Sequence, residues 1–533
     1  MSQADHRELV RSYLDLRWQL DPVAATMAGV ETHDAHLGHF SAPDTKIALA
    51  ALRSVAAAFE ESPAESLEDQ VDQTAALNDI RVSIARLETE RPHELNPEFH
   101  LTHLLQGLFA LIVRGDRSAD LRGLALAARL TDTPRFLADA RAVLQRPAPV
   151  FTETALSVAR GGHALFREAI PQFAAPLTAA VRTRIEDALV PARDALRDFT
   201  DFLAGELTDR SDGDFAIGRD AFEFRIRFEH ALPDTAPALL RYGEALVAEL
   251  DADLARRAEA LAPGTPWRAL AERLRAATPA PGALVAHYAA EMARAREFVA
   301  SRDLARIPAG ALEVVATPRF MTPLVPFAAY DPPGAFADDR RGWFYVTVPE
   351  GGRRADHCIH EIACTALHEG YPGHHLQFLV AQAQTSPVRR VVASPLTVEG
   401  WALYCEELMS DQGFLARPEE VFFQRLHLLW RAVRVVLDVR LHTMGMSVGS
   451  AVDYMVGALG IARDSAEAEV RRYCGAPGYQ LCYAVGRREL VKLRQDYERR
   501  AGSAFSLRGF HDEVLSYGGL PVSLIRWGMG LGE

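Results

Sequence analysis

The most informative segment of this chain is HEGYPGHH, residues 368–375, together with EGWALY at residues 399–404. The two segments bring several histidines and two glutamates close together in the chain. A catalytic zinc commonly keeps two His and one Glu as ligands and leaves one position open for water. A neighbouring carboxylate then takes the proton of that water. The residue types therefore indicate a hydrolytic metal site, with Glu369 as the candidate base and Glu399 as the candidate third ligand.

The histidine spacing departs from the H-E-x-x-H pattern, in which two ligands four residues apart share one helical face. Four residues after His368 stands Pro372, which cannot ligate. His374 lies six residues on, about 240° around an ideal helix, so an unbroken helix would point the two rings apart. Proline breaks the hydrogen-bond ladder and Gly373 permits unusual dihedrals, which removes this objection. We favour His374 over His375 as the second ligand. The alternative is that these histidines cap a kinked helix and bind nothing.

Long blocks of the chain resemble a bacterial family of zinc metallopeptidases catalogued as domain of unknown function eight-eight-five, whose members look like distant relatives of the helical gluzincin peptidases. The resemblance rests on blocks that together cover most of the C-terminal part of the chain: TALHEGYPGHHLQ (365–377), VEGWALYCEEL (398–408), RAVRVVLDVRLHTMGMS (431–447), EVRRYCGAPGYQLCYAVGRREL (469–490) and FSLRGFHDEVLSYGGLPVSLI (505–525). Such motifs in this order are specific for membership and much less specific for substrate.

The resemblance implies a role for each matching position. His368, His374 and Glu399 would be the metal ligands, and Glu369 would be the general base. The implied metal is Zn²⁺, although another divalent first-row ion is compatible with the same ligands. The implied fold is mainly α, a large helical zincin-like metallopeptidase.

Residues just before His368 form a second candidate group. Within DHCIHEIAC (356–364), a continuous helix would align His357, Glu361 and Cys364 with His368 on one stripe. This stripe predicts either hydrogen bonds that hold His368 from behind or a half-exposed helix face. Cys364 and Cys405 lie near the ligands in sequence, but a small buried apolar role is favoured for both.

Two residues further along are candidates for catalysis. A Tyr can stabilise the oxyanion that develops on an attacked carbonyl, and Tyr483 is the first candidate for that role, with Tyr473 second. His511 is a candidate proton donor. Each has a structural alternative, because aromatic residues on apolar helices are more often core and His511 could cap a helix or be buried. Asp438 and His442, four apart on one helical face, form either an outer support for the site or a structural salt bridge.

Composition restricts the class of protein. The chain has 533 residues, 49% of them hydrophobic, and a formal net charge of −13, which makes nucleic acid an unsuitable partner because that surface needs clustered Lys and Arg. The N-terminal residues have no apolar run of the signal-peptide type and no stretch is long enough to cross a membrane, so we expect a cytoplasmic protein without a membrane partner. The odd number of cysteines, 5, indicates free thiols.

The dominant secondary-structure signal is helix, with apolar residues at three-to-four spacing over 44–60, 74–88, 122–145, 179–205, 235–260 and 284–301. Between residues 312 and 350, β-branched and aromatic runs flanked by turn residues predict a small antiparallel β-sheet beside the metal site. GWFYVTVPE (342–350) is the candidate edge strand for pairing with a substrate backbone, or else a buried structural hairpin. We expect a helical region over 1–310 that forms a wall or lid of the cleft, and a metal-site region over 311–533.

The function that these features favour is hydrolysis of an amide bond in a peptide or peptide-like small substrate, by water that a metal activates. The alternative is a metal-dependent tailoring enzyme, a hydrolase or lyase, that acts on a small metabolite. A non-catalytic relative is a third hypothesis, which the intact set of candidate ligands opposes. Oligomeric state is open, and a homodimer is admissible.

Overall fold

The computed structural model describes residues 3–62, 64–114, 117–322, 325, 327–349 and 357–532. The chain divides into two compact units. Unit one comprises Met1–Ile217, Pro318–Leu324 and Gly334–Asp339, and unit two comprises Gly218–Thr317, Val325–Pro333 and Arg340–Glu533. The division therefore falls at residue 217 and not at the expected 310, because the helices between these positions pack on the elements that carry the metal-site motifs.

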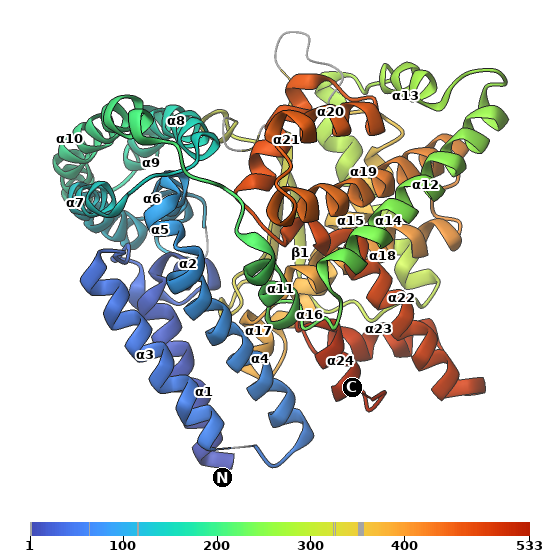
Figure 1. Ribbon diagram of the computed structural model, residues 1–533, viewed down its shortest axis with the longest axis horizontal. Helices are drawn as coiled ribbons and strands as arrows, with labels where there is room; N and C mark the ends of the chain where they lie inside the picture. The colour runs from blue at the N-terminus through green and yellow to red at the C-terminus, as the bar shows by residue number, and fades with distance from the viewer. Residues whose placement is uncertain are drawn as a thin grey trace. The chain divides into compact units, whose positions relative to one another are not determined.

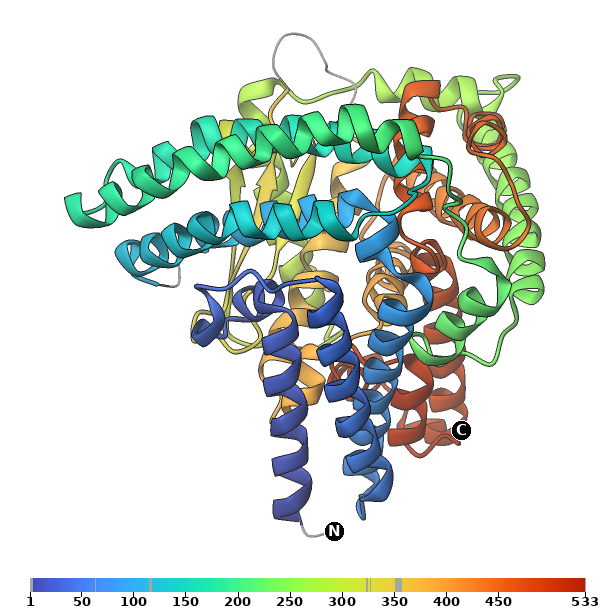
Figure 2. The same cartoon turned by 60° about the vertical axis from the view of Figure 1, so that its left-hand side comes forward.

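Unit one is helical. Its main helices are α1 (Gln3–Leu20), α2 (Pro22–Ala28), α3 (Ala42–Glu61), α4 (Leu67–Ala85), α5 (Pro92–Leu95), α6 (Pro97–Val113), α7 (Ala119–Val143), α8 (Pro149–Ala164), α9 (Ile170–Ala174) and α10 (Ala179–Phe202). Figure 2 shows the blue helices of the first 85 residues side by side, with the teal and green α7 and α10 running crosswise to them. Leucine, alanine and phenylalanine side chains of α6, α7, α8 and α10 form its main core.

Unit two holds the remaining helices and the sheet. Its helices are α11 (Gly218–Phe228), α12 (Ala236–Leu261), α13 (Trp267–Arg275), α14 (Leu284–Ser301), α15 (Ile362–Glu369), α16 (His374–Gln382), α17 (Pro387–Val391), α18 (Pro395–Asp411), α19 (Pro418–Thr443), α20 (Val448–Leu459), α21 (Arg463–Cys474), α22 (Cys482–Ala501), α23 (Leu507–Leu515) and α24 (Val522–Gly528). The long helices α12 and α19 pack along each other, as do α18 and α22 (Figure 1).

The prediction of a mainly helical protein with a small sheet is confirmed, and each predicted helix has a counterpart whose ends lie within a few residues, except at the start of α4. The start of α4 lies seven residues before the predicted one, because Ser66 accepts a hydrogen bond from the backbone of Asp69 and caps the helix there. Among the described residues, no helix combines the length and apolar composition needed to cross a membrane.

The sheet differs from the antiparallel one that was predicted. It comprises β1 (Ala311–Ala316), β2 (Ala328–Asp331) and β3 (Arg341–Val346), in the order β1-β3-β2. β3 pairs in parallel with β1 and antiparallel with β2. The prediction that 342–350 is a free edge strand is therefore wrong, since β3 is central and both of its edges are already hydrogen bonded. Helix α14 packs between this sheet and α15 through a buried cluster that includes Tyr288, Phe344 and Ile362.

Candidate metal centre

The HEGYPGHH stretch is a break between two helices. Helix α15 ends at Glu369 and α16 begins at His374, and the peptide bond between Tyr371 and Pro372 is cis. A side chain at Gly373 would place its Cβ 1.8 Å from the carbonyl oxygen of His368, so only glycine fits this close approach. The break brings the rings of His368 and His374 to 4.8 Å between centroids, although the two residues are six apart in sequence.

Helix α18 holds this break in place and supplies the carboxylate. The indole Nε1 of Trp401 donates to the carbonyl oxygen of Pro372 at 2.9 Å. On its other side, α18 crosses α22 so closely that a Cβ at Gly400 would lie 2.5 Å from the Cα of Gly486. Because neither helix carries a side chain at this crossing, their backbones touch, and Glu399 is fixed next to the two histidines.

Three ligand atoms converge at this point. Oε2 of Glu399 lies 3.5 Å from Nε2 of His374 and 3.9 Å from Nε2 of His368, and the three atoms lie within 4.8 Å of one another. Zinc bonds to N and O of about 2.0–2.2 Å in a tetrahedral site place ligand atoms about 3.3 Å apart. The observed separations therefore need only small side-chain rotations to fit a first-row divalent ion.

The electrostatics of Glu399 and His374 agree with a shared positive charge. Burial alone would raise the pKa of Glu399, but the hydrogen bond and the charge of His374 outweigh it and lower this pKa to about 2. Burial would lower the pKa of His374, yet Glu399 and then Glu369 raise it above its usual value. The centre thus presents a carboxylate that keeps its charge beside an imidazole, a pairing that a bound cation would satisfy directly.

Glu406 supports His368 from the side opposite Glu399. The Nδ1 of His368 lies 2.7 Å from Oε1 of Glu406, which is 1% exposed. A ligating histidine commonly donates its second ring N–H to a carboxylate, which fixes the ring and its tautomer. The sequence carried a signal for this contact, because Glu406 lies two helical turns after Glu399 and therefore on the same face of α18.

Tyr479, which sequence reasoning passed over, contacts a candidate ligand. Its hydroxyl donates to Oε1 of Glu399 at 2.6 Å. The turn that carries it is held by Asp438, whose carboxylate accepts the backbone N–H groups of Gly478 at 3.1 Å and Gln480 at 3.0 Å. Burial raises the pKa of Asp438 to about 7. The only sequence signal for Tyr479 is its position directly after the Pro-Gly turn.

The other predicted catalytic residues lie at different distances from this centre. Glu369 ends α15, is half-buried, and is close enough to His374 to raise its pKa. The Tyr483 ring lies 6.0 Å from that of Tyr479, which is the tyrosine that contacts Glu399. His511 is buried, with Nδ1 2.6 Å from the carbonyl oxygen of Leu304 and Nε2 2.9 Å from the Tyr404 hydroxyl. Both of its ring nitrogens are engaged, so this geometry does not support a role in proton transfer.

Several candidates belong to structural contacts. His375 is fully buried, and its Nδ1 lies 2.9 Å from the hydroxyl of Tyr330 on β2, so it is not part of the cluster formed by its neighbour. His357 precedes α15 and stacks on Phe327; the prediction of one helical stripe from 357 to 368 is wrong there, because the helix begins only at Ile362. Cys405 donates to the carbonyl oxygen of Pro372 at 3.7 Å.

Comparison with known proteins shows that the chain belongs to the family described as "Bacterial protein of unknown function (DUF885)", whose model matches residues 22–529. The fold is similar to that of a "putative lipoprotein of unknown function" from Shewanella oneidensis, with a TM-score of 0.81, 22% identity and coverage of 98% of this chain and 99% of that one. It is also similar to a "putative lipoprotein" from Colwellia psychrerythraea, with a TM-score of 0.85, 18% identity and 98% coverage of both chains. No curated protein matches the sequence.

Proposed function

We propose that the protein is a metal-dependent hydrolase that cleaves an amide bond in a peptide or peptide-like small substrate. The observation that carries this proposal is the convergence of His368, His374 and Glu399 through Nε2, Nε2 and Oε2. Two imidazoles and one carboxylate are the donor set of catalytic zinc sites that keep an open position. Zinc is the metal we expect, and another divalent first-row ion is compatible with these donors.

The residues of the chain would divide the chemistry among them. A divalent ion held by this donor set would polarise the substrate carbonyl and lower the pKa of a water molecule beside it. Glu369, adjacent to His368 in the chain, would accept the proton of the attacking water and deliver it to the leaving nitrogen. The Tyr479 hydroxyl is engaged with Glu399, so Tyr483, whose ring lies 6.0 Å from that of Tyr479, would be the phenol that donates to the developing oxyanion.

Metal content and hydrolysis, measured together on matched variants, test this proposal. Mass spectrometry on the purified protein should find a divalent metal that is lost in His374→Ala and kept in His375→Ala, the matched control at the adjacent position. Blocked peptides should be cleaved in a metal-dependent way, and chelation should stop the reaction. Failure of zinc to bind in a manner sensitive to His374→Ala would refute the mechanism. Turnover of small amides or esters without any peptide cleavage would favour the tailoring enzyme instead.

A further inference from the structure

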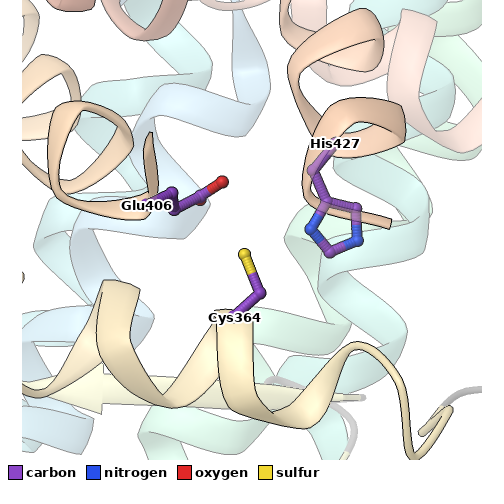
Figure 3. A group of neighbouring side chains, drawn as sticks. All are labelled: Cys364, Glu406 and His427. Atoms are coloured by element: carbon purple, nitrogen blue, oxygen red, sulfur yellow. The ribbon is translucent and has the colours of Figure 1, made fainter. Parts of the chain in front are cut away.

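A second group of potential ligands lies behind the candidate metal centre. Cys364 of α15, Glu406 of α18 and His427 of α19 each offer one ligand atom, and these atoms lie within 4.8 Å of one another. Figure 3 shows the thiol of Cys364 and the carboxylate of Glu406 pointing into the space that one edge of the His427 ring also faces. Cys364 and Glu406 are each 1% exposed. Three different helices thus converge on one buried point.

Glu406 has an oxygen available for this point. Its Oε1 is taken by Nδ1 of His368 at 2.7 Å, whereas its Oε2 is buried and receives no well-aligned hydrogen bond from the residues that the structure describes. The Cys364 thiol is close enough that burial first, and then the charge of Glu406, raise its pKa well above the usual value. A hydrogen bond from this thiol to Glu406 is a further cause of the raised pKa, and a cation that replaced the thiol proton would interact with both the sulfur and the carboxylate.

His427 is arranged as a ligating histidine commonly is. Its Nε2 lies 3.4 Å from Oε1 of Glu361, and a metal-bound imidazole usually donates its second N–H to a carboxylate in this way. Figure 3 shows one nitrogen of the ring on the side of Glu406 and Cys364 and the other on the far side. Because Nε2 is engaged with Glu361, Nδ1 is the atom left for the shared point.

We propose that Cys364, Glu406 and His427 form a second metal site, which takes a thiophilic divalent ion such as Zn²⁺. Thiolate, imidazole and carboxylate are all zinc donors, with bonds of about 2.3 Å to sulfur and about 2.0–2.2 Å to nitrogen and oxygen. These bonds place tetrahedral ligand atoms about 3.3–3.6 Å apart, so the side chains must close by roughly 1 Å. On binding, the thiol loses its proton to water and the sulfur forms a bond to the ion.

The charges around the site set what binding must overcome. Arg431 interacts with both Cys364 and Glu406, and Nε of Arg275 lies 4.0 Å from Oε1 of Glu361. These arginines oppose a cation. A divalent ion adds two positive charges and the thiol releases one proton, so the site gains one positive charge in total. The carboxylates of Glu406 and Glu361 lie on either side of the site and balance this charge.

The second site would be linked to the first without sharing its chemistry. The His368 ring and the Glu406 carboxylate stand between the two positions, so no single atom could bridge two ions. An ion bound at Oε2 would instead fix the carboxylate that orients His368. This inference goes beyond the proposed function, because it requires neither hydrolysis nor an ion at the first position.

X-ray absorption on the full-length, zinc-loaded protein tests the proposal directly. We expect a sulfur neighbour at about 2.3 Å from zinc, retained in His374→Ala and lost in Cys364→Ser. Cys405→Ser is the matched control, since it makes the same change at a different buried thiol, on α18 instead of α15. It should leave the sulfur signal intact. Metal content should fall by about one ion per chain in Cys364→Ser and in His427→Ala.

The outcomes separate this proposal from the proposed function. A wild-type protein without any sulfur neighbour around zinc, or a sulfur signal that survives Cys364→Ser, would overturn the second site. The wild-type spectrum alone shows whether zinc has a sulfur neighbour, so the proposal is tested even if a variant fails to fold. If the first site binds no metal, a single zinc with one sulfur neighbour would remain and would still be lost in Cys364→Ser.

Discussion

Tyr479 offers a sharp test of how the candidate metal centre is held together. Its hydroxyl donates to Oε1 of Glu399 at 2.6 Å, while Oε2 of the same carboxylate faces the two histidines. The bond therefore leaves one oxygen of Glu399 for the ion and fixes the direction of that oxygen. Tyr479→Phe keeps the ring that packs beside Tyr483 and deletes the hydroxyl, which removes its hydrogen bonds to Glu399 and to Tyr483.

The size of the effect follows from the strength of this bond. A hydrogen bond to a charged group contributes about 1.5–3 kcal/mol. Tyr479 is only half-buried, so water can replace part of the lost interaction and the lower end applies. A loss of about 1.4 kcal/mol corresponds to a tenfold change in a binding constant. We therefore expect zinc to bind Tyr479→Phe about tenfold more weakly, within the range of 10–100-fold found when partners of metal ligands are removed.

Competition with a fluorescent zinc chelator at neutral pH measures this affinity. Tyr404→Phe is the matched control, because it also deletes a phenol hydroxyl in unit two, but one that is bonded to His511 and not to a candidate ligand. The control should bind zinc as the wild type does. If Tyr479→Phe binds zinc with unchanged affinity while the protein stays folded, Tyr479 does not position Glu399 for metal binding.

Three further predictions test the base, the helix crossing and a buried acid. Glu369→Gln should lower turnover of an amide substrate at least 100-fold, with unchanged metal content, because the proton acceptor is lost. Gly486→Ala puts a Cβ 2.0 Å from a backbone carbonyl oxygen of α18 and should lower the free energy of unfolding, measured by calorimetry, by about 1–3 kcal/mol. Gly457→Ala is the control, because its Cβ would have nothing within 4 Å. It should raise the free energy of unfolding by about 0.5–1 kcal/mol. The pKa of Asp438 is about 7 in the folded protein and about 3.9 in the unfolded chain. Between these pH values the folded state binds more protons than the unfolded state. The contribution of Asp438 to stability therefore falls as pH rises through that window. The stability advantage of the wild type over Asp438→Asn in urea titrations should therefore shrink from about pH 4 to about pH 7, and an advantage that grows instead would contradict this assignment.

Helices and candidate ligands could be predicted because their signals are local. Apolar residues at three-to-four spacing indicated the helices that were predicted, and the Pro-Gly pair before His374 indicated the break that lets its ring approach that of His368. Whether these residues bind a metal stays a prediction. The strand order could not be predicted, because the parallel pairing of β1 with β3 joins segments separated by a long connection. β2 was missed because its four residues lie next to a turn-rich segment.

The partners of the ligands were the harder part to predict, because they depend on how helices cross. Tyr479 reaches Glu399 across 80 residues of sequence, and Glu406 reaches His368 across 38. Helical spacing places Glu406 on the same face of α18 as Glu399, and Tyr479 directly follows a Pro-Gly turn, but neither signal names the residue that is contacted. His511 illustrates the opposite case, since its chemistry suits catalysis but both of its ring nitrogens are within hydrogen-bond distance of other protein groups.

Helix α18 determines the orientation of His368 at both of its ring nitrogens. Glu399 faces Nε2, and Glu406, two turns further on the same helix, receives Nδ1. The position of α18 depends in turn on the close contact between Gly400 and Gly486. A ring that is already held in place does not lose rotational freedom when an ion binds, which favours tight binding. It follows that a side chain at Gly486 should weaken zinc binding in whatever fraction still folds, although it touches no ligand. Unchanged zinc affinity in folded Gly486→Ala would mean that the ligands adjust independently of this crossing.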